Sequence, residues 1–317
     1  MALNLVTGGG GFIGSHITER LLSEGQDVRV VDDFSTGRRE NLEFVAGSSR
    51  WGRLEVLPGD ITDMELARRA TKDVEFVFHQ AAIPSVPRSV ADPGASNAAN
   101  VTGTLNLLIA ARDAGVKRFV YASSSSVYGE SPTLPKVETM PPEPLSPYAI
   151  SKLAGELYAK AFYRLYRFPT VGLRYFNVFG PRQDPASEYA AVVPRFITAI
   201  ARGGRPMIFG DGEQTRDFTY ISNAVDANIL ASRCGEGAFG GSYNVACGRR
   251  VSLIELVTMI NKIFGTTIQP DHSAARAGDV KHSLADIAAA TEKLGYRPGM
   301  GLEEGLALTA AWFRKKV

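Results

Sequence analysis

The stretch LVTGGGGFIGSH, residues 5–16, decides the fold of this chain. Starting from Gly9, the run matches the pattern G-x-G-x-x-G through Gly11 and Gly14. Starting from Gly8, it matches G-x-x-G-x-x-G through the same two glycines. Glycine runs also form plain turns, so the surrounding sequence has to decide between a turn and a phosphate-binding loop.

The surrounding sequence predicts alternating strands and helices. LNLV (3–6) is typical of a buried strand, the apolar spacing after it predicts a helix over 11–24, and DVRVVD (27–32) predicts a second strand. Further strands are predicted at 53–60, 74–82, 118–124 and 170–176. This alternation predicts an α/β fold of the Rossmann type, a doubly wound parallel sheet with helices on both faces.

The glycine run therefore lies between a strand and a helix, where a dinucleotide-binding turn is expected. Gly8 allows the tight turn, Gly11 lets the backbone approach a pyrophosphate, and Gly14 lets the helix pack closely on the strand. Asp32 ends the second strand, where its carboxylate can accept hydrogen bonds from a ribose diol. Because this carboxylate would repel a 2′-phosphate, the sequence predicts NAD rather than NADP.

Composition narrows the class of protein. Of the 317 residues, 44% are hydrophobic and 21% are charged, which is typical of a globular protein. The net charge of +2 is too small to indicate electrostatic binding to nucleic acid or to a membrane surface. Cys234 and Cys247 suit a reducing compartment, and neither they nor the four histidines have metal-ligand spacing. Because no signal-peptide layout or membrane-spanning segment is visible, we expect a cytoplasmic protein without a metal.

A second motif, SPYAISK (146–152), carries candidate chemistry. Tyr148 and Lys152 are four residues apart near the start of a helix predicted over 147–167, so their side chains share one face. An ammonium and a positively charged nicotinamide would both stabilise the phenolate, and a pKa near 7 requires roughly 4 kcal/mol of such stabilisation. Ser124, at a strand end, would supply a hydroxyl to the substrate oxygen or to Tyr148.

With these residues in place, the chain resembles the extended short-chain dehydrogenase/reductase family, and within it the UDP-hexose 4-epimerases. The motifs that carry the resemblance follow the family's order over nearly the whole chain. They are TGGGGFIG (7–14), DDFSTG (32–37), GDI (59–61), HQAA (79–82), NVTGT (100–104), SSSSVYG (123–129), YAISK (148–152), YFNVFGPRQ (175–183) and RDFTY (216–220). Ser124 aligns with the family's catalytic hydroxyl, and Ser123 and Ser125 are the alternatives.

The resemblance implies where NAD would bind. Asp60 and Ile61 would flank the adenine, residues 80–82 would line the nicotinamide side, and Asn100 would help to build the cleft. The expected cofactor-binding residues are Gly8, Gly11, Phe12, Ile13, Gly14, Asp32, Asp33, Ser35, Thr36, Gly37, Asp60, Ile61, Gln80, Ala81, Ala82, Asn100, Tyr148, Lys152 and Tyr175.

The family begins several reactions with oxidation at C4 of a nucleotide sugar. The dehydratases of the family keep Asp-Glu directly after the catalytic hydroxyl, whereas Ser125 and Ser126 stand here, so the resemblance favours an epimerase. A dehydratase or reductase of the same sugars, and an NAD-binding sensor without catalysis, remain alternatives. An intact set of Ser124, Tyr148 and Lys152 argues against the sensor.

The resemblance also implies a smaller C-terminal α/β domain that holds the UDP-sugar. It divides the chain into an NAD-binding domain, 1–175, and a substrate domain, 176–317, of which a segment around 217–235 packs back on the first domain. Asn177, Arg216 and Arg276 would hold the diphosphate, and Asp279 would orient an arginine or a ribose. Val193 and Phe209 would lie beside the uracil. The other expected substrate-binding residues are Ser85, Ser124 and Ser283. A homodimer is expected.

Ser283 bears on the choice of sugar. It stands where epimerases restricted to glucose and galactose carry tyrosine, which leaves room for a 2-acetamido group. We therefore expect interconversion of UDP-N-acetylglucosamine and UDP-N-acetylgalactosamine, and of UDP-glucose and UDP-galactose. Arg88 keeps a UDP-glucuronate 4-epimerase open as an alternative, because a guanidinium can bind a sugar carboxylate.

Overall fold

The computed structural model describes residues 2–45, 51–184, 191–274 and 281–315. Its largest element is a seven-stranded sheet in the order β11-β6-β5-β4-β1-β2-β3, in which every neighbouring pair is parallel. The strands are β1 (Leu3–Thr7), β2 (Asp27–Asp32), β3 (Leu54–Pro58), β4 (Phe76–His79), β5 (Arg118–Ser124), β6 (Thr170–Tyr175) and β11 (Ser242–Val245). Leaving out β11, this is the Rossmann strand order, so the predicted doubly wound fold is confirmed.

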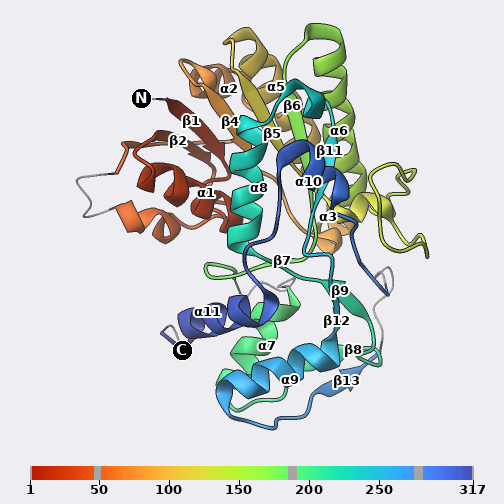
Figure 1. Cartoon of the computed structure of the whole chain (residues 1–317). Helices are drawn as coiled ribbons and strands as arrows, with labels where there is room; N and C mark the ends of the chain where they lie inside the picture. The colour runs from red at the N-terminus through yellow and green to blue at the C-terminus, as the bar shows by residue number, and fades with distance from the viewer. Residues whose placement is uncertain (1, 46–50, 185–190, 275–280, 316–317) are drawn as a thin grey trace.

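Successive residues of each strand face opposite sides of the sheet, and both sides are buried. In β1, Val6 packs into one hydrophobic core and its neighbour Leu5 into another. Helices α1 (Phe12–Ser23) and α8 (Ile221–Arg233) cover the first side (Figure 1). Helices α2 (Met64–Thr71), α5 (Gly103–Asp113) and α6 (Pro147–Tyr166) cover the second. The strands are apolar on both faces because helices cover both.

Helix α6 (Pro147–Tyr166) begins where the sequence provides an N-terminal cap. Ser146 accepts a hydrogen bond from the backbone N–H of Ala149 at 3.1 Å, and Pro147 occupies the first turn, where no backbone donor is needed. Near the middle of the helix, a Cβ on Gly155 would overlap the Tyr121 hydroxyl of β5. The cap and this close approach bring the first turn of α6 to the carboxyl end of the sheet.

The chain beyond residue 176 builds a smaller lobe below the sheet (Figure 1). It contains α7 (Val192–Ala201), α9 (Leu253–Phe264) and α11 (Leu302–Arg314) with three two-stranded pairings. The pairs are β7 (Val178–Phe179) with β10 (Thr219–Tyr220), β8 (Met207–Phe209) with β13 (Asp271–Ser273), and β9 (Thr215–Asp217) with β12 (Arg250–Ser252). Other elements of this half lie with the large sheet, namely α8, β11 and α10 (Ala288–Leu294), which packs on both.

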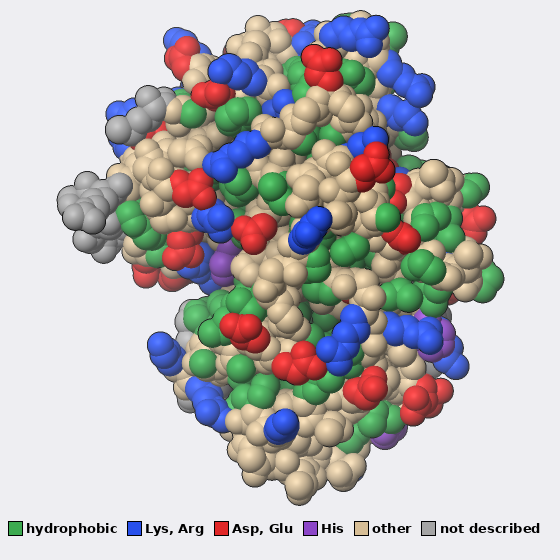
Figure 2. All heavy atoms as spheres, in the orientation of Figure 1, with side chains coloured by type: hydrophobic (Ala, Val, Ile, Leu, Met, Phe, Trp, Pro, Cys, Tyr) green, Lys and Arg blue, Asp and Glu red, His purple; other side chains and the backbone are tan. Residues whose placement is uncertain are grey.

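Short helices connect these elements. They are η1 (Arg39–Val45), α2 (Met64–Thr71), α3 (Val86–Ala91), α4 (Pro93–Asn97), η2 (Ala98–Thr102), α5 (Gly103–Asp113), η3 (Ser125–Tyr128), η4 (Glu236–Ala238) and α10 (Ala288–Leu294). Within the described parts of the chain, no helix is both long and apolar enough to cross a membrane. Acidic and basic side chains are mixed on the face shown in Figure 2, as the small net charge predicts.

Candidate active site

The glycine turn between β1 and α1 is packed too tightly for side chains. Gly8 has φ +68°, and a Cβ there would lie 2.7 Å from the backbone nitrogen of Ala81. A Cβ on Gly14 would overlap the carbonyl oxygen of Gly8. Helix α1 is capped by Gly11, which has no side chain to bind the first N–H groups of the helix. The amino end of α1, with its partial positive charge, thus faces an uncovered backbone cradle in which Phe12 and Ile13 form the first turn.

Asp32 connects this cradle to the next loop. Its carboxylate accepts hydrogen bonds from the backbone N–H groups of Gly10 and Phe34, each at 2.8 Å. Burial raises the pKa of Asp32, and these two bonds counter that effect. In the loop, Asp33 accepts bonds from the backbone and hydroxyl of Ser35, while Thr36 is exposed and Gly37 packs against the Asp32 carboxylate. The predicted ribose-binding segment is therefore ordered around one carboxylate.

The adenine end that the resemblance implies lies at the carboxyl end of β3. Asp60 is exposed and accepts a hydrogen bond from the backbone N–H of Thr62 at 2.8 Å, whereas Ile61 is buried. A surface cavity of about 520 Å³ is lined by Asp60 together with Gly59. Asp60 therefore lies beside a recess at the same sheet edge as the glycine turn.

Asn100 shapes the cleft through protein contacts. Its side-chain oxygen accepts a bond from the backbone N–H of Ile83 at 2.8 Å, and its amide donates to the Ser151 hydroxyl at 3.0 Å. Ser151 lies on α6 between Tyr148 and Lys152. Asn100 thus fixes the loop after β4 to the first turns of α6, in agreement with a role in building the cleft.

Gln80 and Tyr175 share a buried polar triangle with Asn228 of α8. The Asn228 amide donates to the Tyr175 hydroxyl at 2.7 Å, and Gln80 donates to the Asn228 oxygen at 3.0 Å. Tyr175 in turn donates to the Gln80 oxygen at 3.3 Å, while the nearby residues Ala81 and Ala82 are partly buried. Sequence reasoning missed Asn228, since a single asparagine in a helix gives no signal.

His79 is a second residue that the sequence analysis left without a role. The Thr104 hydroxyl donates a hydrogen bond to the Asn100 carbonyl. The same hydroxyl oxygen must therefore accept a hydrogen bond from His79 Nε2, at 2.8 Å. His79 Nδ1 then accepts from the Thr7 hydroxyl at 2.7 Å, directly before the glycine turn. Burial, followed by the charge of Lys152, lowers the pKa of His79 to about 3. His79 is a neutral link between three elements of the cleft.

Ser124, Tyr148 and Lys152 meet at the carboxyl end of β5. The Ser124 oxygen accepts bonds from the backbone and hydroxyl of Ser126 at 3.2 and 2.9 Å, and the Ser124 side chain also interacts with Tyr148 and acts to lower its pKa. Because Ser126 occupies its lone pairs, Ser124 is set to donate its own proton. Ser123 instead donates to Glu156. Of the three candidates Ser123, Ser124 and Ser125, Ser124 is therefore the one for which an interaction with the Tyr148 side chain is found.

The electrostatics of Tyr148 differ from the expectation. Burial raises the pKa of the phenol, and the bond from Ser124 lowers it without cancelling that rise. Lys152 donates to the Ala122 carbonyl at 2.9 Å, and its Nζ lies 5.9 Å from the Tyr148 ring centre. Burial lowers the pKa of Lys152 to about 8. The groups of the chain thus keep Tyr148 protonated at neutral pH, because burial outweighs the hydroxyl contact.

The loop after β4 also packs on α6. The Ser89 hydroxyl accepts a bond from the backbone N–H of Tyr148 at 3.0 Å. Ser85 caps α3 by accepting from the backbone of Arg88 at 3.3 Å, so Ser85 and Arg88 lie on the same short helix as Ser89. This contact brings α3, and the predicted substrate residue Ser85 with it, to the first turn of the catalytic helix.

Four of the predicted substrate residues line one cavity of about 220 Å³ in the smaller lobe. They are Asn177, Val193, Phe209 and Arg216. Arg216 donates to the carbonyls of Thr215 and Lys281, both at 3.0 Å. The cavity combines aromatic and aliphatic walls with a guanidinium and an amide, the chemistry that a nucleoside diphosphate requires.

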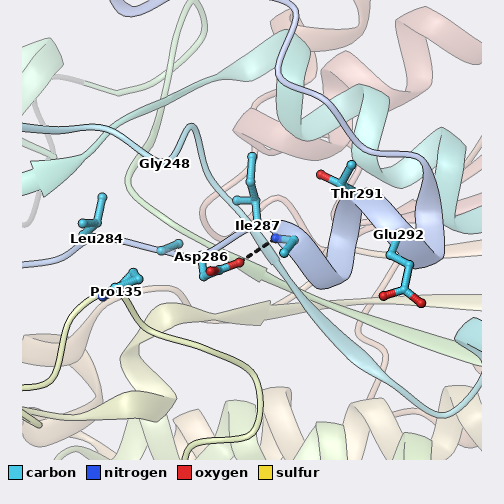
Figure 3. A pocket seen from close by; sticks show the side chains of 9 residues that line it. Pro135, Gly248, Leu284, Asp286, Ile287, Thr291 and Glu292 are labelled. Carbon is cyan, nitrogen blue, oxygen red and sulfur yellow. Dashed lines mark hydrogen bonds between the residues drawn. The ribbon is translucent and has the colours of Figure 1, made fainter.

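Ser283 lies next to this cavity. Its hydroxyl accepts a bond from the Asn177 amide at 3.2 Å, and the same amide donates to the Asp217 carbonyl at 2.9 Å. The predicted residues Arg276 and Asp279 lie outside the described residues. A larger cavity of about 560 Å³, lined by Leu284, Ile287 and their neighbours, contains none of the predicted site residues (Figure 3). There, the Asp286 carboxylate accepts from the Ala288 backbone at 2.7 Å.

Comparisons with known proteins agree with this geometry. A profile of the NAD dependent epimerase/dehydratase family matches residues 4–246. The chain belongs to this family. It is 42% identical over 314 residues to the UDP-glucose 4-epimerase of Mycolicibacterium smegmatis, covering 98% of both chains. Two solved structures are also similar to it over nearly their full lengths.

The first solved structure is the UDP-N-acetylglucosamine 4-epimerase of Methanobrevibacter ruminantium in complex with UDP-N-acetylmuramic acid. Its TM-score is 0.93 and its identity 41%, with 100% of this chain and 99% of that one covered. The second is the UDP-glucose 4-epimerase of Thermotoga maritima with UDP-glucose, at a TM-score of 0.91 and 40% identity, covering 99% of both chains.

As a member of the NAD dependent epimerase/dehydratase family, the protein is an enzyme whose cofactor is NAD. The residues present fit that cofactor. The backbone cradle at Gly8 and Gly14 has no room for a Cβ, which leaves the amino end of α1 open to a pyrophosphate. Asp32 provides a buried carboxylate next to the cradle, at the position where a ribose diol would be bound.

Proposed function

We propose that this enzyme is a UDP-sugar 4-epimerase that interconverts UDP-N-acetylglucosamine and UDP-N-acetylgalactosamine, and also UDP-glucose and UDP-galactose. One observation carries the proposal: Ser124 interacts with Tyr148, whose ring centre lies 5.9 Å from Lys152 Nζ, in a chain whose glycine turn suits NAD. The second lobe supports it with a cavity suited to a nucleoside diphosphate.

The residues of the chain divide the proton chemistry between them. The positive charges of a bound nicotinamide and of Lys152 would lower the pKa of Tyr148, so that its phenolate takes the proton of the C4 hydroxyl and later returns it. Ser124 would donate a hydrogen bond to the same sugar oxygen. Lys152 would hold a positive charge below the phenol. When bound, NAD would supply a reversible acceptor for the C4 hydride, so that a 4-keto sugar would exist only transiently.

The structure supports epimerisation over dehydration through the two residues after Ser124. Elimination of water requires an acid and a base in addition to Tyr148. Ser125 and Ser126 stand in these places, and the Ser126 hydroxyl donates to Ser124. Neither serine is an acid or base at neutral pH, whereas epimerisation needs only that the keto sugar turn over and be reduced on its other face.

The smaller lobe would hold the UDP group while the sugar turns. Arg216 and Asn177 would bind the diphosphate, joined by Arg276, with Asp279 orienting an arginine or a ribose. Val193 and Phe209 would lie beside the uracil. We accordingly propose an NAD-binding domain over 1–175 and a nucleotide-sugar domain over 176–317, with the segment around 217–235, which includes α8, packed on the first.

Turnover without added cofactor tests the proposal. Purified protein is incubated with UDP-N-acetylglucosamine, UDP-glucose or UDP-glucuronate, and the products are separated. The expected result is the 4-epimer of the first two sugars with no net reduction of NAD. A dominant UDP-glucuronate activity would instead point to Arg88 on α3 as a carboxylate ligand, and loss of water or an absence of turnover would contradict an epimerase.

Ser283→Tyr is expected to separate the two sugar classes. A tyrosine ring beside Asn177 would occupy the space proposed for a 2-acetamido group, so kcat/KM for UDP-N-acetylglucosamine should fall about 100-fold and that for UDP-glucose less than about 10-fold. Ser283→Ala is the control, because it removes the same hydroxyl without filling the space. Equal losses on both sugars in the tyrosine variant would contradict a role for Ser283 in admitting the 2-acetamido group.

We also propose a homodimer through the outer face of α6. Ile150, Leu157 and Leu165 are 55%, 59% and 72% exposed, and their spacing places them on one side of the helix. A solvent-exposed apolar stripe of this length is typical of a protein interface.

Leu157→Asp combined with Leu165→Asp should therefore convert a dimer to a monomer in sedimentation velocity, because two carboxylates would be buried in the interface. Leu308→Asp on α11 is the matched control, since Leu308 is 45% exposed on another helix. A wild-type protein that sediments as a monomer would contradict the dimer.

A further inference from the structure

A buried ion pair lies directly behind the catalytic residues. Arg174 of β6 contacts Glu156 of α6 through two hydrogen bonds, Nε to Oε1 at 2.9 Å and a terminal nitrogen to Oε2 at 2.7 Å. Their side chains are only 8% and 6% exposed. Placing two charges in the interior costs several kcal/mol for each ion, and apolar residues there are often as stable. Stability alone therefore does not account for this pair.

The pair touches the catalytic set from two directions. Glu156 follows Lys152 by one turn of α6. Its carboxylate accepts a hydrogen bond from the hydroxyl of Ser123, the residue directly before Ser124. The ion pair thus fixes the end of β5, which carries Ser124, to the helix that carries Tyr148 and Lys152.

The network continues to the substrate side. Arg174 donates to the Tyr128 hydroxyl at 2.8 Å, and Tyr128 donates to the Asn244 oxygen at 2.7 Å. The Asn244 amide donates to the carbonyls of Lys136 and Asp286 at 2.9 and 3.0 Å. Asp286 is three residues from Ser283, so an unbroken chain of hydrogen bonds joins the catalytic helix to the segment beside the proposed sugar site.

The charges around the pair are few. Burial raises the pKa of Tyr121 of β5, and electrostatic interactions with Tyr148 and Glu156 add to that rise. Burial lowers the pKa of Arg174, but its bonds and attraction to Glu156 outweigh burial and raise it. On the far side, Tyr128 and Glu138 also interact electrostatically with Arg174. Glu156 is therefore the main partner that balances the guanidinium, and Tyr121 interacts with both Glu156 and Tyr148.

We propose that the Glu156–Arg174 pair is a positioning element of the active site, which holds Ser124 and α6 in register with the segment around Asp286 and balances the charge behind Tyr148. The inference rests on the proposed function where turnover is concerned. It also predicts a change in the pKa of Tyr148, which can be measured without any turnover of substrate.

Glu156→Gln is the first test, made on the NAD-loaded protein. The glutamine keeps the shape but leaves the Arg174 charge unbalanced, and an added cation lowers the pKa of a nearby phenol. The pKa of Tyr148, followed by NMR of ring-labelled tyrosine and assigned with Tyr148→Phe, should fall by about 0.5 or more. The acid limb of the pH profile of kcat should move to lower pH by the same amount. At the plateau of that profile, kcat should fall about 10-fold and KM should change less than about 2-fold.

The double variant Glu156→Gln with Arg174→Gln separates charge from structure. It removes both charges and keeps an amide pair, so the pKa of Tyr148 should return to the wild-type value. Glu75→Gln is the control, because it breaks the ion pair of Glu75 with Lys117, whose side chain is 68% exposed. An unchanged Tyr148 pKa in Glu156→Gln, with only a lower unfolding temperature, would overturn the charge-balancing role.

Ser123→Ala tests the positioning role if Glu156→Gln does not fold. This variant keeps the ion pair and removes its contact with the residue before Ser124. We expect kcat to fall about 5-fold or more with KM and the Tyr148 pKa unchanged. An unchanged kcat would overturn the positioning role. A wild-type protein without turnover would count against the proposed function, while the NMR titration would still decide the charge-balancing claim.

Discussion

Tyr148→Phe should reduce kcat by about 10³-fold or more and leave NAD bound. The phenol hydroxyl is the group that would exchange a proton with the C4 oxygen, and general acid–base catalysis contributes about 10²–10⁴-fold. The ring itself can stay in place, because the Tyr148 backbone N–H still donates to Ser89 and the cap at Ser146 is untouched. The measurements are steady-state turnover and the NAD content of the purified variant.

Two comparisons make the Tyr148→Phe result specific. Ser124→Ala should lower kcat less, since it removes a hydrogen-bond donor and not the proton acceptor. Tyr158→Phe is the matched control, because Tyr158 lies on the same helix with its side chain partly exposed at the surface. If Tyr148→Phe retains most of its activity, Tyr148 is not the acid–base group.

Gly14→Ala should weaken NAD binding by about 10- to 100-fold. The new Cβ would overlap the carbonyl oxygen of Gly8 and lie 2.9 Å from the Cα of Gly9, and both neighbours are backbone that has no rotamer with which to adjust. Overpacking of this kind costs about 1–3 kcal/mol, which corresponds to this loss in affinity if the strain opens the cradle. The measurement is NAD affinity by calorimetry on cofactor-stripped protein.

Gly237→Ala is the control for Gly14→Ala. Gly237 lies in a 3₁₀ helix, where an added Cβ would meet no atom within 4 Å. It should leave NAD affinity within about 2-fold of wild type, because it touches nothing in the cradle. If Gly14→Ala binds NAD as tightly as Gly237→Ala does, the glycine turn does not hold the pyrophosphate.

Local sequence pattern predicted most of the large sheet. The strands at 27–32 and 118–124 have the bounds that were predicted, because their apolar runs are bounded by polar or turn residues. The fourth strand is shorter than the predicted 74–82 and covers Phe76–His79, since the chain leaves the sheet at Gln80 to form the cleft. No period in the sequence indicates that β11 joins β6, because that pairing is made across some 70 residues of chain.

The residues of the site that belong to sequence motifs were predictable. The isolated polar residues that contribute to the site were not. Tyr148, Lys152 and the glycines carry fixed spacings, so the sequence identified them. Asn228 and Ser89 act through single hydrogen bonds from distant elements, which no spacing reveals. The raised pKa of Tyr148 was also not predictable, because it depends on how deeply folding buries the phenol.

The fate of deuterium at C4 of the sugar tests the central claim most directly. UDP-glucose and UDP-N-acetylglucosamine labelled at C4 are incubated with the wild-type enzyme in ordinary water, and the recovered 4-epimers are analysed by mass spectrometry. If hydrogen leaves C4 as a hydride and returns to the same carbon, each epimer keeps its label. Loss of the label to solvent would contradict the account, because it would mean that C4 is inverted through proton exchange.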